Sequence, residues 1–237
     1  MPSPSPSRSQ ALPEQTATPV QPAVSGDHPG VNELFALLAY GEVAAFYRLT
    51  EEARMAPNLA GRINLARMAA AEMGHFDVLR EALLRRGVDV VPAMTKYAPA
   101  LENYHRLTTP STWLEALVKT YVGDALAADF YLEIAGSLPA EAADVVRAVL
   151  SETGHSQFVV AEVRAAVSAS DRQRHRLALW SRRLLGEAIT QAQFVMAEHD
   201  ELVDLVLSSG EGLTQMTEFF ERLQETHQNR VRELGLG

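Results

Sequence analysis

From Val31 onward, apolar and polar residues alternate with the period of an α-helix. Apolar positions three or four residues apart share one helical face, which indicates amphipathic helices. Pro57 interrupts the first helix, and Asn58 suits the N-cap of a second. This second helix is expected to end at about Arg86, before Gly87. The inner positions are Leu34, Leu38, Glu42, Ala45 and Leu49 in the first helix, and Leu65, Met68, Glu72, His75, Leu79 and Leu83 in the second.

Prolines and capping residues divide the rest of the chain. Pro92 and Pro99 predict a long connection over Val88–Pro110, with a short helix around Ala100–Leu107. Further helices are predicted over Thr112–Ala135, Ala140–Ala169, Asp171–Glu198 and Leu213–Leu234. The pattern therefore predicts an all-α fold. Its centre is a four-helix bundle of two helical hairpins joined by a long crossover, with additional C-terminal helices.

The two predicted hairpins resemble each other in their polar residues. Each carries a glycine followed by a carboxylate, then a Phe-Tyr pair, then a Glu-x-x-His motif. These are Gly41-Glu42, Phe46-Tyr47 and Glu72/His75 in the first half, and Gly123-Asp124, Phe130-Tyr131 and Glu152/His155 in the second. The interval from the carboxylate to the motif is 30 residues in the first half and 28 in the second. Such a repeat indicates a duplicated hairpin.

These repeated polar residues fall on apolar stripes, where unpaired carboxylates are costly to bury. A Glu and a His three residues apart on a helix can converge on one ion, and this donor set suits a divalent first-row metal. A single such motif is more often a solvated face, but a second copy favours a shared metal site. The predicted ligands are Glu42, Glu72, His75, Asp124, Glu152 and His155. Glu72 and Glu152 would bridge two ions, and the two remaining carboxylates would be terminal ligands.

Three further residues are candidates near this site. Asp129 is an alternative to Asp124, although five helical residues rotate it by about 140°. It could instead accept a hydrogen bond from a ligand histidine or be a surface charge. Glu187 follows Gly186 in an apolar stretch and is an additional ligand, a pocket residue or a paired core carboxylate. Tyr121, one turn before Asp124, has either a redox or hydrogen-bonding role or a packing role.

Charge and composition narrow the functional classes. The net charge of −9 over 237 residues disfavours a surface that is basic throughout, as a general nucleic-acid binder would have. With no cysteine, thiolate metal sites are excluded. Residues 1–30 are rich in Pro, Ser, Gln and Thr and are expected to form a disordered tail before one domain over 31–237. No run is apolar for long enough to span a membrane, so a cytoplasmic protein is expected. One basic run is a solvated helix face or a phosphate-binding patch: Arg172, Arg174, His175, Arg176, Arg182 and Arg183.

At the paired motifs the sequence resembles the ferritin-like di-iron proteins. Among these it is similar to the actinobacterial branch related to the tRNA hydroxylase that acts on a methylthio-isopentenyl-adenosine base. The resemblance extends from about Val31 to Leu236. Five residues match its metal pattern directly: Glu42, Glu72, His75, Glu152 and His155. Asp124 departs from the expected glutamate. Ala71 and Ser151 stand where many relatives carry a supporting aspartate.

The resemblance implies two iron ions, with manganese as the alternative metal. It also implies a monooxygenase that uses dioxygen and an electron donor to hydroxylate the isopentenyl chain of a modified adenosine in tRNA. The basic run would then contact tRNA, and we expect a homodimer. The alternative is a ferritin-like metal-binding protein, or an oxidase of iron or peroxide, without an organic substrate. A structural bundle that has lost its metal is the third reading.

Overall fold

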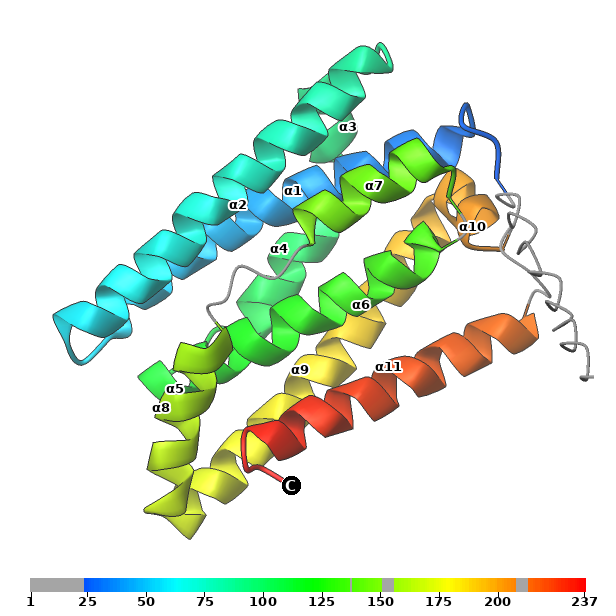
Figure 1. The fold of residues 1–237 in the computed structure, drawn as a ribbon. Coiled ribbons are helices and arrows are strands. Elements are labelled where there is room, and N and C mark those ends of the chain that lie inside the picture. Colours follow the sequence, from blue (N-terminus) through cyan, green and yellow to red (C-terminus); the bar gives the residue numbers. More distant parts are fainter. Residues whose placement is uncertain (1–23, 137, 151–155, 208–212) are drawn as a thin grey trace, which may run out of the picture.

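A computed structural model describes residues 24–136, 138–150, 156–207 and 213–237. All regular structure within these ranges is helical (Figure 1). The elements are α1 (Pro29–Glu52), η1 (Ala53–Met55), α2 (Leu59–Arg85), α3 (Val90–Thr95), α4 (Ala98–Leu107), α5 (Trp113–Val118), η2 (Lys119–Gly123), α6 (Asp124–Ala135), α7 (Ala140–Val149), α8 (Ser156–Ser168), α9 (Asp171–Glu198), α10 (Asp200–Leu207) and α11 (Leu213–Glu233). The predicted all-α class is confirmed.

Local capping chemistry sets several helix boundaries where the sequence predicts them. The side chains of Asn58, Thr112 and Ser170 each accept a hydrogen bond from the backbone N–H three residues later. Gly87 has a φ of 72°, the left-handed conformation that commonly ends a helix. These boundaries were predictable because each depends on neighbouring residues only.

The helices pack in two groups around a shared cavity. The long antiparallel α1 and α2 lie side by side, and α7 packs against α2 and α6. Helices α5, η2 and α6 follow one another and contact α9, while α11 lies along α6 and α9 (Figure 1). The crossover, containing α3 and α4, packs on α1, and α4 also contacts α9. Residues far apart in sequence thus meet between α1, α2 and the η2–α6 segment.

One predicted helix differs from the structure, and two short helices, α3 and α10, were not predicted. The continuous helix predicted over Ala140–Ala169 is wrong, because α7 ends at Val149. Helix α8 begins at Ser156 and packs on α5 and α9, in a different direction from α7 (Figure 1). The short α3 was not predicted; it brings Val90 and Met94 into the core.

The folded chain begins before Val31. Val24 is buried in the core, and the His28 ring accepts a hydrogen bond from the Gly30 N–H at 3.0 Å. Residues 1–23 of the expected tail lie outside the described ranges. In the part of the chain that the structure describes, no helix has the length and apolarity needed to cross a membrane.

Gly30 allows α1 to approach α10 closely, and Gly30→Ala is expected to destabilise the protein. An added Cβ would lie 2.3 Å from the Glu201 carbonyl oxygen and 2.7 Å from the Leu205 Cβ. We expect a loss of at least about 1–3 kcal/mol in the free energy of unfolding, measured by urea denaturation. Gly186→Ala is the control, because nothing lies within 4 Å of its added Cβ. It should stabilise α9 by roughly 0.5–1 kcal/mol. Equal effects of the two substitutions would contradict the packing argument.

Candidate metal centre

Three of the predicted ligands meet at one end of the cavity. Glu42 comes from α1, whereas Glu72 and His75 stand one turn apart on α2. The His75 Nδ1 lies 3.3 Å from the Glu72 Oε2 and 3.4 Å from the Glu42 Oε2. Each residue offers one donor atom within 4.8 Å of the other two. Metal–ligand bonds of about 2.0–2.2 Å place neighbouring donors roughly 3 Å apart, so this group can hold a metal ion.

Burial and mutual hydrogen bonding shift the pKa values of these groups. Desolvation raises the pKa of the Glu42 carboxyl to about 8. Hydrogen bonds to Glu42 and Glu72 raise the pKa of His75 to about 10. Burial alone would raise the pKa of Glu72, but its hydrogen bonds to His75 and Glu42 lower it. At neutral pH the group therefore carries a protonated Glu42, an ionised Glu72 and a cationic His75, with no net charge.

Binding of a divalent metal ion near pH 7 is expected to release about two protons, because the ligands must be the Glu42 carboxylate and neutral His75. Affinity should rise with pH as these pKa values are approached. In the metal-free protein, the stability that these groups contribute changes with pH in the opposite direction. The pKa values of Glu42 and His75 in the folded protein lie above their ordinary values of 4.5 and 6.5, so the stability that these two groups contribute is lost as pH rises from about 4.5 to about 10. Calorimetric titration in two buffers of different ionisation enthalpy counts the protons. If no protons are released, the assignment of Glu42 and His75 as metal ligands is wrong.

Asp124 lies apart from this group in the structure. Both of its oxygens accept hydrogen bonds from the Arg48 Nη2, at 2.7 and 2.9 Å. Its side chain is 42 % exposed, on the cavity wall. The surrounding protein raises the pKa of Asp124, and the Arg48 charge opposes this shift. Glu152 and His155, the predicted ligands of the second motif, lie outside the described residues.

The other candidates have partners or positions of their own. Asp129 is held by Arg230 of α11, with one Oδ1 contact of 2.8 Å. Tyr121 lines the cavity, and its hydroxyl donates to Glu233 of α11. Glu187 is half-buried on α9 and is not a member of the Glu42, Glu72 and His75 group.

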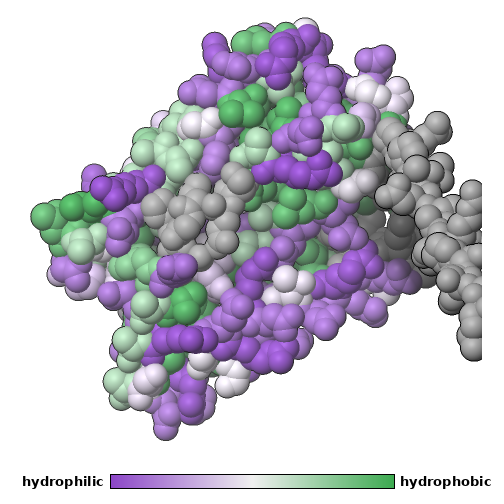
Figure 2. Space-filling model, in the orientation of Figure 1, coloured by the Kyte–Doolittle hydropathy of each residue, from purple (hydrophilic) through white to green (hydrophobic). Residues whose placement is uncertain are grey.

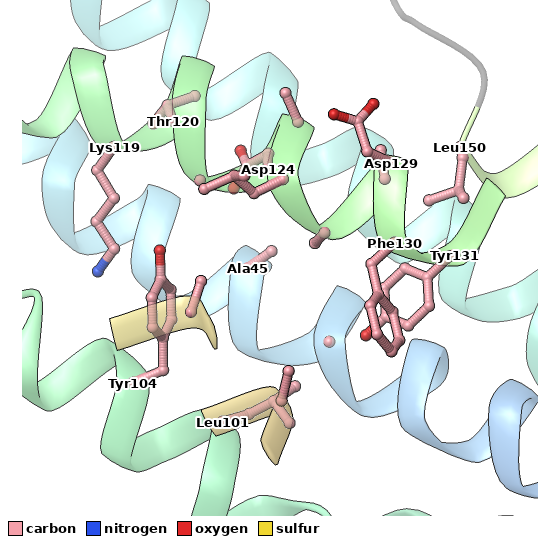
Figure 3. A pocket seen from close by; sticks show the side chains of 18 of the residues that line it. Ala45, Leu101, Tyr104, Lys119, Thr120, Asp124, Asp129, Phe130, Tyr131 and Leu150 are labelled. Carbon is pink, nitrogen blue, oxygen red and sulfur yellow. The ribbon is translucent and has the colours of Figure 1, made fainter. Parts of the chain in front are cut away.

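The group opens onto a cavity of about 680 Å³. Lys119 and Tyr104 lie on one side of the cavity, and Phe130 and Tyr131 on the other (Figure 3). Hydrophilic residues cover most of the molecular face in Figure 2, and apolar residues reach the surface in the strip between α7 and α6. The metal group thus shares an internal space with a mainly apolar wall.

A buried ionic cluster beside the cavity was missed by the sequence analysis. Arg48 also donates from Nη1 to the Glu52 Oε2 at 3.0 Å and to the Thr120 Oγ1 at 3.1 Å. The Lys119 Nζ lies 3.9 Å from the Glu52 Oε1. Arg48 and Glu52 were not among the inner positions expected of α1, yet both are buried. The burial of Glu52 could have been predicted, because Glu52 continues the helical spacing of Glu42, Ala45 and Leu49.

The basic run lies on α9, and several of its members are engaged within the protein. Arg176 contacts Glu115 at 2.8 Å, and Arg174 contacts Asp171 at the same distance. Arg183 donates to the Leu107 carbonyl at 2.6 Å. Arg172 and Arg182 are exposed.

Comparison with known proteins identifies the family of this helical domain. Residues 27–209 match the family model described as "Ferritin-like domain, actinomycetes". The match spans α1 to α10 and includes the Glu42, Glu72 and His75 group. A search of the curated proteins found no match. The family match confirms the ferritin-like character expected from the paired motifs, and the chain belongs to the ferritin-like domain family of actinomycetes.

Proposed function

We propose that the protein is a non-haem iron monooxygenase that hydroxylates an apolar group of an organic substrate. The main observation that supports this function is that Glu42, Glu72 and His75 open onto the large, mainly apolar cavity. Bound iron would supply dioxygen activation, with one oxygen atom entering a C–H bond and the other leaving as water, at the cost of two electrons from an external donor and two protons. The set of six ligands expected from the sequence would hold two iron ions, but the proposal requires only the ion at these three residues.

The cavity wall supports an apolar substrate. Most of the wall area is apolar, and its apolar side chains include Leu101, Leu126, Phe130, Ile189, Val195 and Leu223. The small residues Ala45, Ala127 and Ala128 also line it. A cavity of several hundred cubic ångströms with a mainly apolar wall is typical of a small-molecule site. The protein's own contribution would be to orient an alkyl chain and to exclude water from the reacting carbon.

The substrate class that we propose is the isopentenyl chain of a modified adenosine in tRNA. Its alkyl chain suits the apolar wall, and the base would have to leave the stacked helix to enter. Arg172 and Arg182 are exposed on α9, and Arg176, which also contacts Glu115, lies about 40° from Arg172 around the helix. These arginines are the ones that would contact phosphates. The net charge of −9 favours contact through such a local patch over general RNA binding.

A deletion strain tests the substrate. Modified nucleosides in its tRNA should lack the hydroxylated isopentenyl side chain, and wild-type protein should restore it, whereas His75→Ala should not. Unchanged hydroxylation in the deletion strain would exclude the tRNA substrate. Oxygen consumption by the iron-loaded protein with a reductant tests the oxygenase separately. The absence of any iron-dependent oxygen consumption would exclude the oxygenase.

A second candidate is an oxidase of iron or peroxide without an organic substrate. It is favoured by the concentration of carboxylates at the cavity, where Glu42, Glu72 and Asp124 all contribute to the wall. Such a protein would consume dioxygen or hydrogen peroxide in proportion to added ferrous iron, with no organic product. Oxygen consumption is therefore measured with and without an organic substrate. An iron oxidase consumes as much oxygen without the substrate as with it, whereas a monooxygenase consumes more when the substrate is present.

A further inference from the structure

The ionic cluster of Arg48, Glu52, Lys119 and Asp124 stands beside the candidate metal group. Arg48 is 7 % exposed and Lys119 is 2 % exposed. Arg48 divides its donors between the two acids, binding Glu52 through Nη1 and both oxygens of Asp124 through Nη2. A guanidinium held by two carboxylates is among the stronger charged contacts in proteins, and it stays charged at all physiological pH values.

The charges of this cluster balance without any metal. Burial lowers the pKa of Lys119 to about 8, so it remains a cation at neutral pH. Arg48 and Lys119 together offset the two carboxylates of Glu52 and Asp124. A divalent ion at Glu42, Glu72 and neutral His75 gives a second neutral unit. A further divalent cation at Asp124 would have to displace the Arg48 Nη2 and leave the buried guanidinium with Glu52 as its one carboxylate partner in the cluster, which is unfavourable.

The helix that carries Asp124 has the geometry that this cluster requires. Residues Lys119–Gly123 form a π-helical turn, in which backbone bonding joins residues five apart. Lys119 and Asp124 are five residues apart. In a regular α-helix they would differ by about 140°, whereas a π turn brings them toward the same side. Thr120 on this turn completes the contacts of Arg48.

We infer that the Arg48 guanidinium takes the place of a metal ion at Asp124, so that Asp124 binds Arg48 and is not a metal ligand. The inference rests on the proposed metal-binding function. It departs from the six-ligand site expected from the sequence, in which Asp124 is a terminal ligand.

The number of ions per chain tests the inference. Metal-free protein is titrated with Mn²⁺ and with anaerobic Fe²⁺, and the bound metal is measured by elemental analysis after gel filtration. We expect Asp124→Asn to bind as many ions per chain as the wild type, and His75→Ala to bind fewer. Because Asp124→Asn leaves Arg48 with one carboxylate fewer, the neutral double variant Arg48→Gln/Asp124→Asn provides a second test. It should also bind as many ions as the wild type.

Fewer ions per chain in both Asp124 variants than in the wild type would overturn the inference and identify Asp124 as a ligand. In that case the proposed metal-binding function would stand. No bound ion in the wild type would instead overturn the proposed function. The two failures are therefore distinguishable in the same titration.

Discussion

Arg48→Met is expected to lower the free energy of unfolding by about 3–5 kcal/mol, the usual cost of breaking a buried ion pair. The substitution keeps most of the side-chain volume but removes the charge that holds Glu52, whose side chain is 5 % exposed. Asp124 also loses both of its hydrogen bonds to Arg48. Its carboxylate faces the cavity and can be hydrated there, so it contributes less to the loss of stability than Glu52 does. Urea denaturation of the metal-free protein at pH 7, followed by circular dichroism, measures the effect.

Two variants separate this cost from a general effect of losing an arginine. Arg85→Met removes an exposed partner of Glu81, with 3.9 Å between the charged atoms, and should change stability by less than about 0.5 kcal/mol. Adding Glu52→Gln to Arg48→Met removes the buried acid that has lost its Arg48 contact and keeps only the longer one to Lys119, and should recover part of the loss. If Arg48→Met and Arg85→Met are equally mild, the cluster does not stabilise the core.

Glu72→Gln is expected to weaken metal binding by at least about 100-fold. The amide keeps the shape of the side chain but removes a charged donor from a group that offers only three. Glu72 is also the carboxylate whose pKa is lowered, so it is ionised and available at neutral pH. Calorimetric titration with Mn²⁺ measures the affinity, and elemental analysis of purified protein gives the metal content.

The matched control is Glu81→Gln on the same helix. Its carboxylate is exposed and lies near Arg85 at the surface, so metal affinity should be unchanged. Circular dichroism checks that both variants keep the helical fold. Equal metal content in wild type and Glu72→Gln would show that the metal is held elsewhere.

The sequence predicted those parts of the protein that depend on local pattern. Helical periodicity placed Glu42, Glu72 and His75 on inner faces, and two inner faces of an antiparallel hairpin must meet. The same periodicity correctly directed Asp124 toward the interior, since it lines the cavity. It could not identify the partner of Asp124, because Arg48 is 76 residues away and the contact depends on how two hairpins pack.

Long-range packing also explains the other differences. Glu52 continues the inner spacing of α1, but its pairing with Arg48 four residues away resembles that of a solvated helix face. Contacts with Thr120 and Lys119, which the sequence does not show, make the two residues a buried cluster. The end of α7 at Val149 carries no proline or glycine signal, since Val149 is followed by Leu150 and Ser151. The end of α7 could therefore not be predicted from helix-capping residues.

The π turn at Lys119–Gly123 bears on how the two halves of the chain can be compared. A π turn accommodates one more residue than an α turn, so it acts as a single-residue insertion in the third helix of the bundle. Glu42 lies within an uninterrupted α1, whereas Asp124 directly follows the inserted residue. Matching motifs therefore do not imply matching side-chain directions. Removing one residue from the turn would rotate α6 by about 100° relative to α5 and separate Asp124 from Arg48.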